Sequence, residues 1–136
     1  MFDLSMSVTL LYSIFGTAIL IYFPYLVVAY ARFQVGMDLA APRAMFDKLP
    51  AYGQRATWAH QNSFETFVIY LAAALLAYLT KIDSDLVMNC AIAYPISRFF
   101  YSVFYIANIP LGRSLMFGVG SFCSGALFVL SLMAVK

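Results

Sequence analysis

The sequence has few charged residues, few cysteines and no low-complexity segments. Only 10% of its 136 residues are charged and 64% are hydrophobic, whereas soluble domains carry about 25% charged residues. This composition predicts an integral membrane protein. The net charge of +2 is too small to indicate binding to nucleic acid. Because charge runs, glycine-serine linkers, proline-rich tracts and repeats are all absent, we expect a single membrane domain over residues 1–136.

The two cysteines give no sign of chemistry. Cys90 and Cys123 both lie inside apolar segments, and neither belongs to a CxxC motif or has a histidine nearby. The sequence therefore predicts no metal site and does not support a disulfide. We interpret both residues as unreactive thiols in the apolar core. The N-terminal stretch MFDLSMSVTLLYS lacks a basic region and a cleavage site, which favours a first membrane span over a signal peptide.

Four apolar segments are long enough, at about 20 residues each, to cross a bilayer as helices. They cover residues 4–33, 54–79, 85–106 and 113–135, and Pro24 is expected to kink the first of them. The connections after the second and third segments are short, which is typical of antiparallel neighbours. The sequence thus predicts an all-α fold, an integral membrane four-helix up-down bundle.

Basic residues are distributed unevenly over the two ends of this bundle. Four crossings place both termini on one side, with the two residues Lys81 and Lys136. The other side has the long first loop, 34–53, and five basic residues: Arg32, Arg43, Lys48, Arg55 and Arg113. The positive-inside rule then places the long loop in the cytoplasm and both termini outside the cell or in a lumen.

Polar residues interrupt the second segment over RATWAHQNSFETFVIY, residues 55–70. Such residues are costly in lipid and are tolerated mainly where they face a bundle interior or a water-filled cavity. Arg98 lies about midway along the third segment, at a depth comparable to Glu65, so we predict an ion pair between the two. The polar residues of the second segment are Arg55, His60, Gln61, Asn62 and Glu65.

The third segment has a polar-aromatic stripe with the helical spacing 4, 3, 4, 3. It consists of Tyr94, Arg98, Tyr101, Tyr105 and Asn108. In one interpretation, the polar residues hold the helices together and the tyrosines pack between them. In the other, the stripe lines a pocket that opens to the cytoplasmic face. One ion pair would suffice to join two helices, so the larger number of polar groups favours the pocket.

Two motifs resemble those of a known family. The stretch RATWAHQNSFETF has the spacing R-A-x-x-A-H-x-N-x-x-E, and the third segment has R-x-x-Y-x-x-x-Y followed by an arginine. Both are similar to motifs of the MAPEG family, the membrane-associated proteins in eicosanoid and glutathione metabolism. The resemblance implies a homotrimer of four-helix subunits. It also implies that glutathione, the co-substrate, binds between adjacent subunits near the cytoplasmic face.

The resemblance implies roles for particular residues. Arg113 is the candidate catalytic residue, because a guanidinium near a thiol stabilises the thiolate. As juxtamembrane charges, however, Arg113 and Arg55 also have a purely structural interpretation, and His60 has one as a packing residue. The candidate glutathione-binding residues are Arg55, His60, Asn62, Glu65, Arg98, Tyr101 and Tyr105.

Two positions depart from the family pattern. Trp58 stands where glutathione-using members have an arginine, so one anchor for a carboxylate is missing. Arg113 follows Tyr105 with seven residues between them instead of six, and one residue turns a helical side chain by about 100°. Both departures bear on whether glutathione still binds.

We expect a membrane glutathione transferase or peroxidase that acts on lipophilic electrophiles entering from the bilayer. The alternative is a non-catalytic MAPEG-fold protein that serves as a lipid-binding scaffold or as an accessory subunit of a larger membrane complex. A transporter or proton relay using Glu65 and His60 is less favoured, since the sequence has no inverted repeat or pair of broken helices. The sequence leaves the electrophile open, and the membrane as well: a bacterial inner membrane or the endoplasmic reticulum.

Overall fold

The computed structural model describes residues 5–135, and this part of the chain is helical and contains no β-strand. The predicted all-α class is thereby confirmed. The predicted start of the first span at residue 4 and the terminal Lys136 lie outside the described residues. The elements are α1 (Met6–Gln34), the short 3-10 helix η1 (Pro42–Lys48), α2 (Ala51–Leu79), α3 (Asp85–Ile106) and α4 (Pro110–Ala134).

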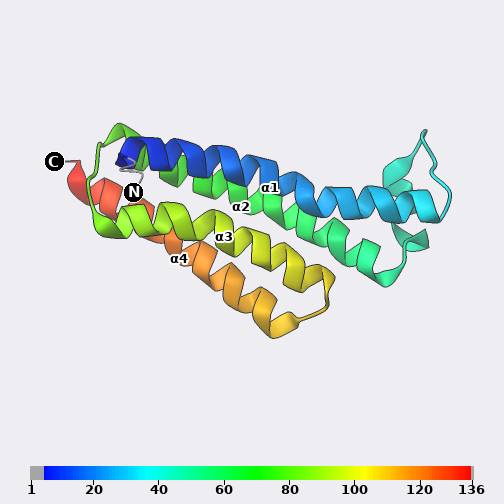
Figure 1. Ribbon diagram of the computed structural model, residues 1–136. Helices are drawn as coiled ribbons and strands as arrows, with labels where there is room; N and C mark the ends of the chain where they lie inside the picture. The colour runs from blue at the N-terminus through cyan, green and yellow to red at the C-terminus, as the bar shows by residue number, and fades with distance from the viewer. Residues whose placement is uncertain (1–4, 136) are drawn as a thin grey trace.

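The four long helices lie side by side and alternate in direction (Figure 1). The start of α1, the α2–α3 connection and the end of α4 lie at one end of the molecule. The helix η1 and the α3–α4 turn lie at the other. Four of the arginines that the positive-inside rule places on one side of a membrane belong to segments at this second end: Arg32, Arg43, Arg55 and Arg113.

Three helices, α1, α2 and α4, are long and apolar enough to cross a membrane. In the most apolar stretch of each, only 28% of the residues are buried, so most of their hydrophobic side chains point outward. The 22 residues of α3 are sufficient in length, but its sequence is interrupted by Arg98, serines and tyrosines, and it is not among these three helices. A crossing by α3 therefore stays a prediction.

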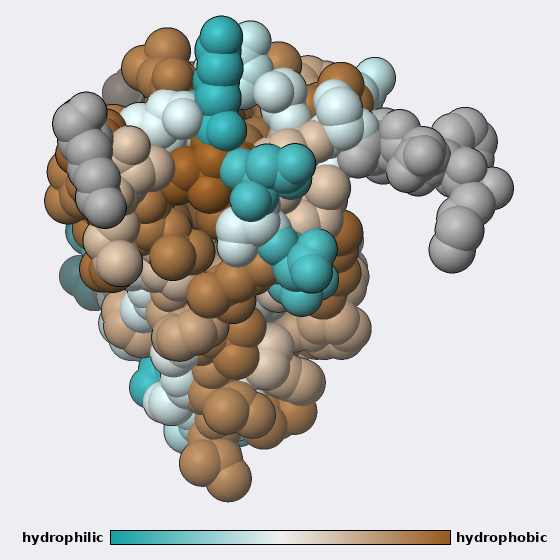
Figure 2. Space-filling model, turned by 90° about the vertical axis from the view of Figure 1, so that its left-hand side faces the viewer, coloured by the Kyte–Doolittle hydropathy of each residue, from teal (hydrophilic) through white to brown (hydrophobic). Residues whose placement is uncertain are grey.

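The surface and the interior differ in the size of their side chains. Large hydrophobic residues such as Phe15, Leu26 and Leu132 are exposed, whereas alanines such as Ala73 and Ala77 are fully buried. Small residues at helix contacts let the backbones approach closely, as is usual in membrane proteins. Figure 2 shows the end of the molecule that has the α2–α3 connection, where hydrophilic residues gather among hydrophobic neighbours.

Prolines explain where two helices begin. Pro50 is extended, with φ −62° and ψ 160°, and α2 starts directly after it, three residues before the predicted boundary. Pro110 is the first residue of α4, where a missing N–H costs nothing. This helix also starts three residues earlier than predicted. Helix α1 continues past the buried Pro24, and the kink predicted there stays a prediction.

Two apolar clusters fill the interior. The larger lies toward the chain ends and includes Leu10, Tyr70, Cys90, Tyr94 and Cys123. Both cysteines are buried, as the sequence predicted, and neither forms a disulfide. The smaller cluster, Val28, Ala31, Leu49 and Ala56, lies toward η1. Along α2 and α3, the polar residues Asn62 and Arg98 fall between the two clusters.

Candidate functional site

Arg98 and Asn62 join α3 to α2 in the interior. The Arg98 side chain is only 4% exposed, and its Nη2 donates a hydrogen bond of 2.8 Å to Asn62 Oδ1. The guanidinium carbon also lies 4.0 Å from the centroid of the Tyr101 ring. Its Nε is buried and has no hydrogen-bond partner. The arginine is thus held by an amide and an aromatic face.

The predicted ion pair between Glu65 and Arg98 is wrong. Arg98 donates to Asn62 instead, and no ion pair joins it to Glu65. Glu65 lies three residues beyond Asn62, which rotates its side chain by about 60° around the helix. As a result the carboxylate is exposed on the outer face of α2. It is therefore free to meet a ligand or another chain.

Aromatic rings extend the site from Arg98 to Arg113. The rings of Tyr101 and Tyr105 pack edge to face at 5.6 Å between centroids. The guanidinium carbon of Arg113 lies 4.6 Å from the centroid of Tyr105. Arg98, Tyr101, Tyr105 and Arg113 are therefore linked by successive contacts that run from α3 to the start of α4. Cation–π contacts of this kind attract a guanidinium to the ring face and favour a defined orientation of the group.

The position of Arg113 follows from the end of α3. Asn108 adopts a left-handed conformation, φ 60°, which asparagine tolerates, and the chain then turns into Pro110. The backbone N–H of Arg113 donates to Ile109 O at 3.0 Å, so Arg113 lies in the first turn of α4. Its side chain borders a hollow of about 140 Å³ that Trp58 and Tyr105 also line.

A second, more open hollow adjoins the first. It has a volume of about 380 Å³ and is lined by Trp58, Gln61, Asn62, Glu65 and Tyr105. Trp58 and Tyr105 border both hollows and their ring centroids are 6.4 Å apart. The site accordingly offers two amides, a carboxylate and a phenol around one space, and the guanidinium of Arg113 borders the adjoining hollow. These groups suit a small polar ligand with charges of both signs.

Two of the candidate glutathione-binding residues, Arg55 and His60, form hydrogen bonds to backbone carbonyls of other helices. Arg55 Nε donates to Ile106 O at 3.0 Å, which satisfies a carbonyl at the C-terminus of α3 that no helical N–H can reach. His60 Nδ1 lies 2.8 Å from Ile21 O, and because a carbonyl only accepts, this nitrogen is the donor. His60 therefore joins α2 to α1, on a different side of α2 from Asn62.

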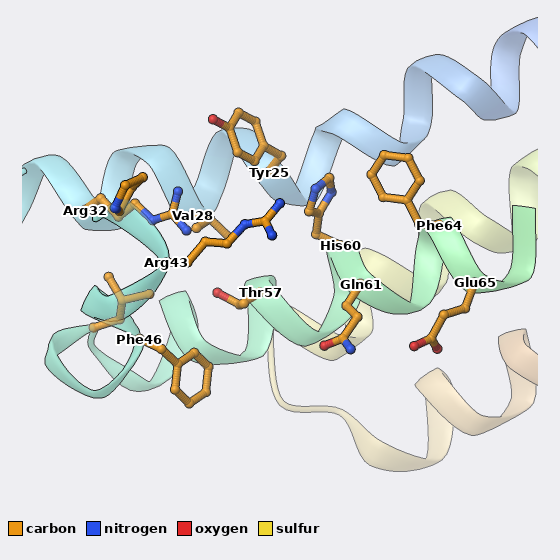
Figure 3. A pocket seen from close by; sticks show the side chains of 12 residues that line it. Tyr25, Val28, Arg32, Arg43, Phe46, Thr57, His60, Gln61, Phe64 and Glu65 are labelled. Atoms are coloured by element: carbon orange, nitrogen blue, oxygen red, sulfur yellow. The ribbon is translucent and has the colours of Figure 1, made fainter. Parts of the chain in front are cut away.

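Sequence reasoning missed a third hollow, of about 690 Å³, between α1, η1 and α2 (Figure 3). Arg32, Arg43 and His60 are among its lining residues. The sequence indicated both arginines only as charges near a membrane surface. Nothing in its pattern showed that residues 42–48 fold as a helix beside α1 and α2. Among the described residues, no group of three or more histidine, cysteine, aspartate or glutamate side chains could hold a metal ion.

The fold and the site together define the class of protein. The chain is a helical membrane protein with a polar and aromatic site at one end of its helices. The model of the MAPEG family matches residues 9–133, nearly the whole chain. The protein belongs to the MAPEG family. Comparison with curated proteins gives no match. Comparison with solved structures gives none either.

Proposed function

We propose that this protein is a membrane glutathione transferase or peroxidase that acts on lipophilic electrophiles. One observation carries the proposal: the guanidinium of Arg113, set over Tyr105, borders a hollow that adjoins the space beside Asn62 and Glu65. Glutathione has a thiol, two carboxylates and an ammonium group. The site supplies a guanidinium near the thiol and a carboxylate, Glu65, that is suited to the ammonium group.

Arg113 would act on the thiol. A fixed cation near a thiol favours the thiolate, which is the nucleophilic form. In conjugation, the thiolate sulfur forms a bond to the carbon of the electrophile, and the leaving group departs with the bonding electrons. In peroxide reduction, two glutathione molecules are oxidised to the disulfide while the peroxide yields an alcohol and water. Both reactions need the thiolate.

The remaining groups would orient the tripeptide. The exposed carboxylate of Glu65 is suited to the ammonium group, and the phenols of Tyr101 and Tyr105 can donate hydrogen bonds. Arg98 is buried and bonded to Asn62, so its proposed part is to hold the Asn62 amide in place. Arg55 and His60 are bonded to other helices. Within one chain they would support the walls of the site.

The proposal includes an assembly and an orientation. Four membrane-crossing helices per chain would form a homotrimer, with glutathione at the boundary between subunits. The η1 end, which has Arg43 and Arg55, would face the cytoplasm and the termini the opposite side. The exposed hydrophobic side chains would contact membrane lipids, from which the electrophile enters. A bacterial inner membrane and the endoplasmic reticulum both fit this arrangement.

A second function is favoured by a specific observation. Three candidate residues, Arg55, His60 and Arg98, are engaged in bonds between helices. Trp58 occupies the wall of the hollow without offering a charge. Both features agree with a non-catalytic member of the family. Such a protein would serve as a lipid-binding scaffold or as an accessory subunit of a larger membrane complex.

Activity distinguishes the two functions. Detergent-purified protein is assayed with saturating glutathione and either an aryl halide or a lipid hydroperoxide. Loss of the Arg113 guanidinium in Arg113→Ala should lower the rate about a hundredfold or more, as for other groups that stabilise a reacting anion. Lys48→Ala removes a charge at the same end and should retain activity. If the unmodified protein is inactive with both substrates, or Arg113→Ala is as active as Lys48→Ala, the enzymatic proposal fails.

A further inference from the structure

The hollow between α1, η1 and α2 has a basic end and an aromatic end. Arg32 enters it from the end of α1, and Arg43 reaches across it from η1 toward His60 (Figure 3). Tyr25 and Phe64 line the part that lies deeper along the helices. At about 690 Å³, the hollow falls within the usual size range of small-molecule sites.

The two arginines have charge that no side chain of the described chain neutralises. Arg32 Nε is buried and has no hydrogen-bond partner, and no ion pair joins Arg32 or Arg43 to a described carboxylate. A buried guanidinium nitrogen without a partner is costly, and both guanidinium groups belong to residues that line the hollow, where they can bind an anion. The hollow is therefore suited to a carboxylate.

The position of Arg43 is fixed by the way η1 attaches to the long helices. Met45 and Leu49 are 2% and 6% exposed, so they hold η1 and its C-terminal neighbour against the core. Gln54 Nε2, on α2, donates to Phe46 O at 3.3 Å. Arg43 itself is exposed on this anchored segment. Its guanidinium can thus meet a ligand without a rearrangement of the backbone.

This hollow shares two lining residues with the hollow beside Asn62. Gln61 and Glu65 line both of them, and both side chains are exposed on α2. Figure 3 shows the two residues at the rim of the hollow, on the side away from Arg32. A ligand that contacts Gln61 and Glu65 therefore lies at the border of both hollows, with Asn62 and Tyr105 on one side and Arg43 on the other.

We propose that Arg43, together with Arg32, binds one carboxylate of the tripeptide and so determines specificity. This assignment rests on the proposed function, because it concerns the same ligand. Trp58 cannot pair with a carboxylate, and the nearby hollow supplies two guanidinium groups that can. The anchor is thus provided from η1 and α1 instead of from α2.

The test combines changes in the protein with changes in the ligand. Calorimetry on detergent-purified protein compares glutathione with its glycine ethyl ester and with the γ-aminobutyryl analogue, which lacks the glutamyl α-carboxylate. The variants are Arg43→Gln, Arg43→Lys and the control Lys48→Gln, which removes an exposed charge from the same segment. Arg43→Gln should weaken glutathione binding about tenfold or more, Arg43→Lys should weaken it less, and Lys48→Gln should leave it unchanged.

The ligand comparison identifies the contact. One of the two analogues should bind the unmodified protein more weakly than glutathione does, and Arg43→Gln should weaken that analogue no further. The assignment is overturned if Arg43→Gln weakens the binding of all three ligands equally, or if its glutathione affinity equals that of Lys48→Gln. It is also overturned if the only effect of Arg43→Gln is the loss of copurified anionic lipid. If the unmodified protein binds no glutathione, the proposed function fails together with this assignment. The other outcomes leave the proposed function intact.

Discussion

Replacing Asn62 with alanine should destabilise the protein, because it leaves the guanidinium of Arg98 without its hydrogen-bond acceptor. Arg98 is 4% exposed, and its Nε already has no partner. In Asn62→Ala the bond of 2.8 Å to Oδ1 is lost. The Tyr101 ring face, 4.0 Å away, remains the nearest favourable contact for the charge.

The expected loss of unfolding free energy in Asn62→Ala follows from two typical ranges for hydrogen bonds. A hydrogen bond to a charged group contributes about 1.5–3 kcal/mol in soluble proteins. Hydrogen bonds between membrane helices average about 0.6 kcal/mol and reach about 1.7 kcal/mol. Since the Arg98–Asn62 bond involves a buried full charge, we expect a loss of about 2 kcal/mol in the free energy of unfolding. This corresponds to about a thirtyfold change in the unfolding equilibrium constant.

The assay is unfolding in mixed micelles with increasing dodecyl sulfate, followed by far-ultraviolet circular dichroism and by tryptophan fluorescence. Trp58 is the only tryptophan and lies next to Tyr105, so its emission reports on the site itself. Asn89→Ala, at an exposed position on α3, is the matched control and should change the free energy by less than about 0.5 kcal/mol. Asn62→Asp keeps an acceptor and should retain stability.

Two further variants isolate the interaction. The double variant Asn62→Leu with Arg98→Met removes both polar partners, so it should be less destabilised than Asn62→Ala alone. Glu65→Gln should have no effect on stability, because Glu65 is exposed and unpaired with Arg98. Equal effects of Asn62→Ala and Asn89→Ala, or a large effect of Glu65→Gln, would refute this account of the interior.

Three more predictions concern other parts of the fold. Gly53→Val should lower the free energy of unfolding by about 1–3 kcal/mol in the same dodecyl sulfate titration, because a Cβ there would lie 2.8 Å from the Cβ of Ala31 on α1. An unchanged titration would contradict this close approach. Arg55→Gln should cost about 1 kcal/mol, by loss of the bond to Ile106 O, without changing glutathione affinity; an affinity loss would instead place Arg55 at the ligand. A membrane-impermeant thiol reagent applied from the cytoplasmic side should label Ala40→Cys and not Asp83→Cys, and the reverse pattern would invert the proposed orientation.

The helices could be predicted because their signals are local. The bounds of α3 agree with the predicted residues 85–106, since short polar loops flank a mainly apolar segment of helical length. The starts of α2 and α4 were each predicted three residues too late. Proline was interpreted as part of the loop, whereas Pro50 directly precedes α2 and Pro110 occupies the first turn of α4. A proline at such a position promotes a helix start.

The pairing of side chains between helices was harder to predict than the helices themselves. Position along the helix indicated that Glu65 and Arg98 have a similar depth, but depth does not determine which way a side chain faces. Rotation between α2 and α3 depends on how their surfaces pack, and this packing brings Asn62 to Arg98 instead. The contact of Arg113 with Tyr105 depends likewise on the turn at Asn108. The placement of η1, and with it Arg43, depends on tertiary contacts alone.

Glutathione binding is the measurement that tests the central claim most directly. Calorimetry with detergent-purified protein, combined with the ultraviolet absorption of the thiolate, reports both the complex and the ionisation of the ligand. The account predicts saturable binding and a thiolate band that Arg113→Ala abolishes and Lys48→Ala retains. Absence of binding at millimolar glutathione would contradict it. In that case the bonds of Arg98, Arg55 and His60 between helices would identify a structural member of the family.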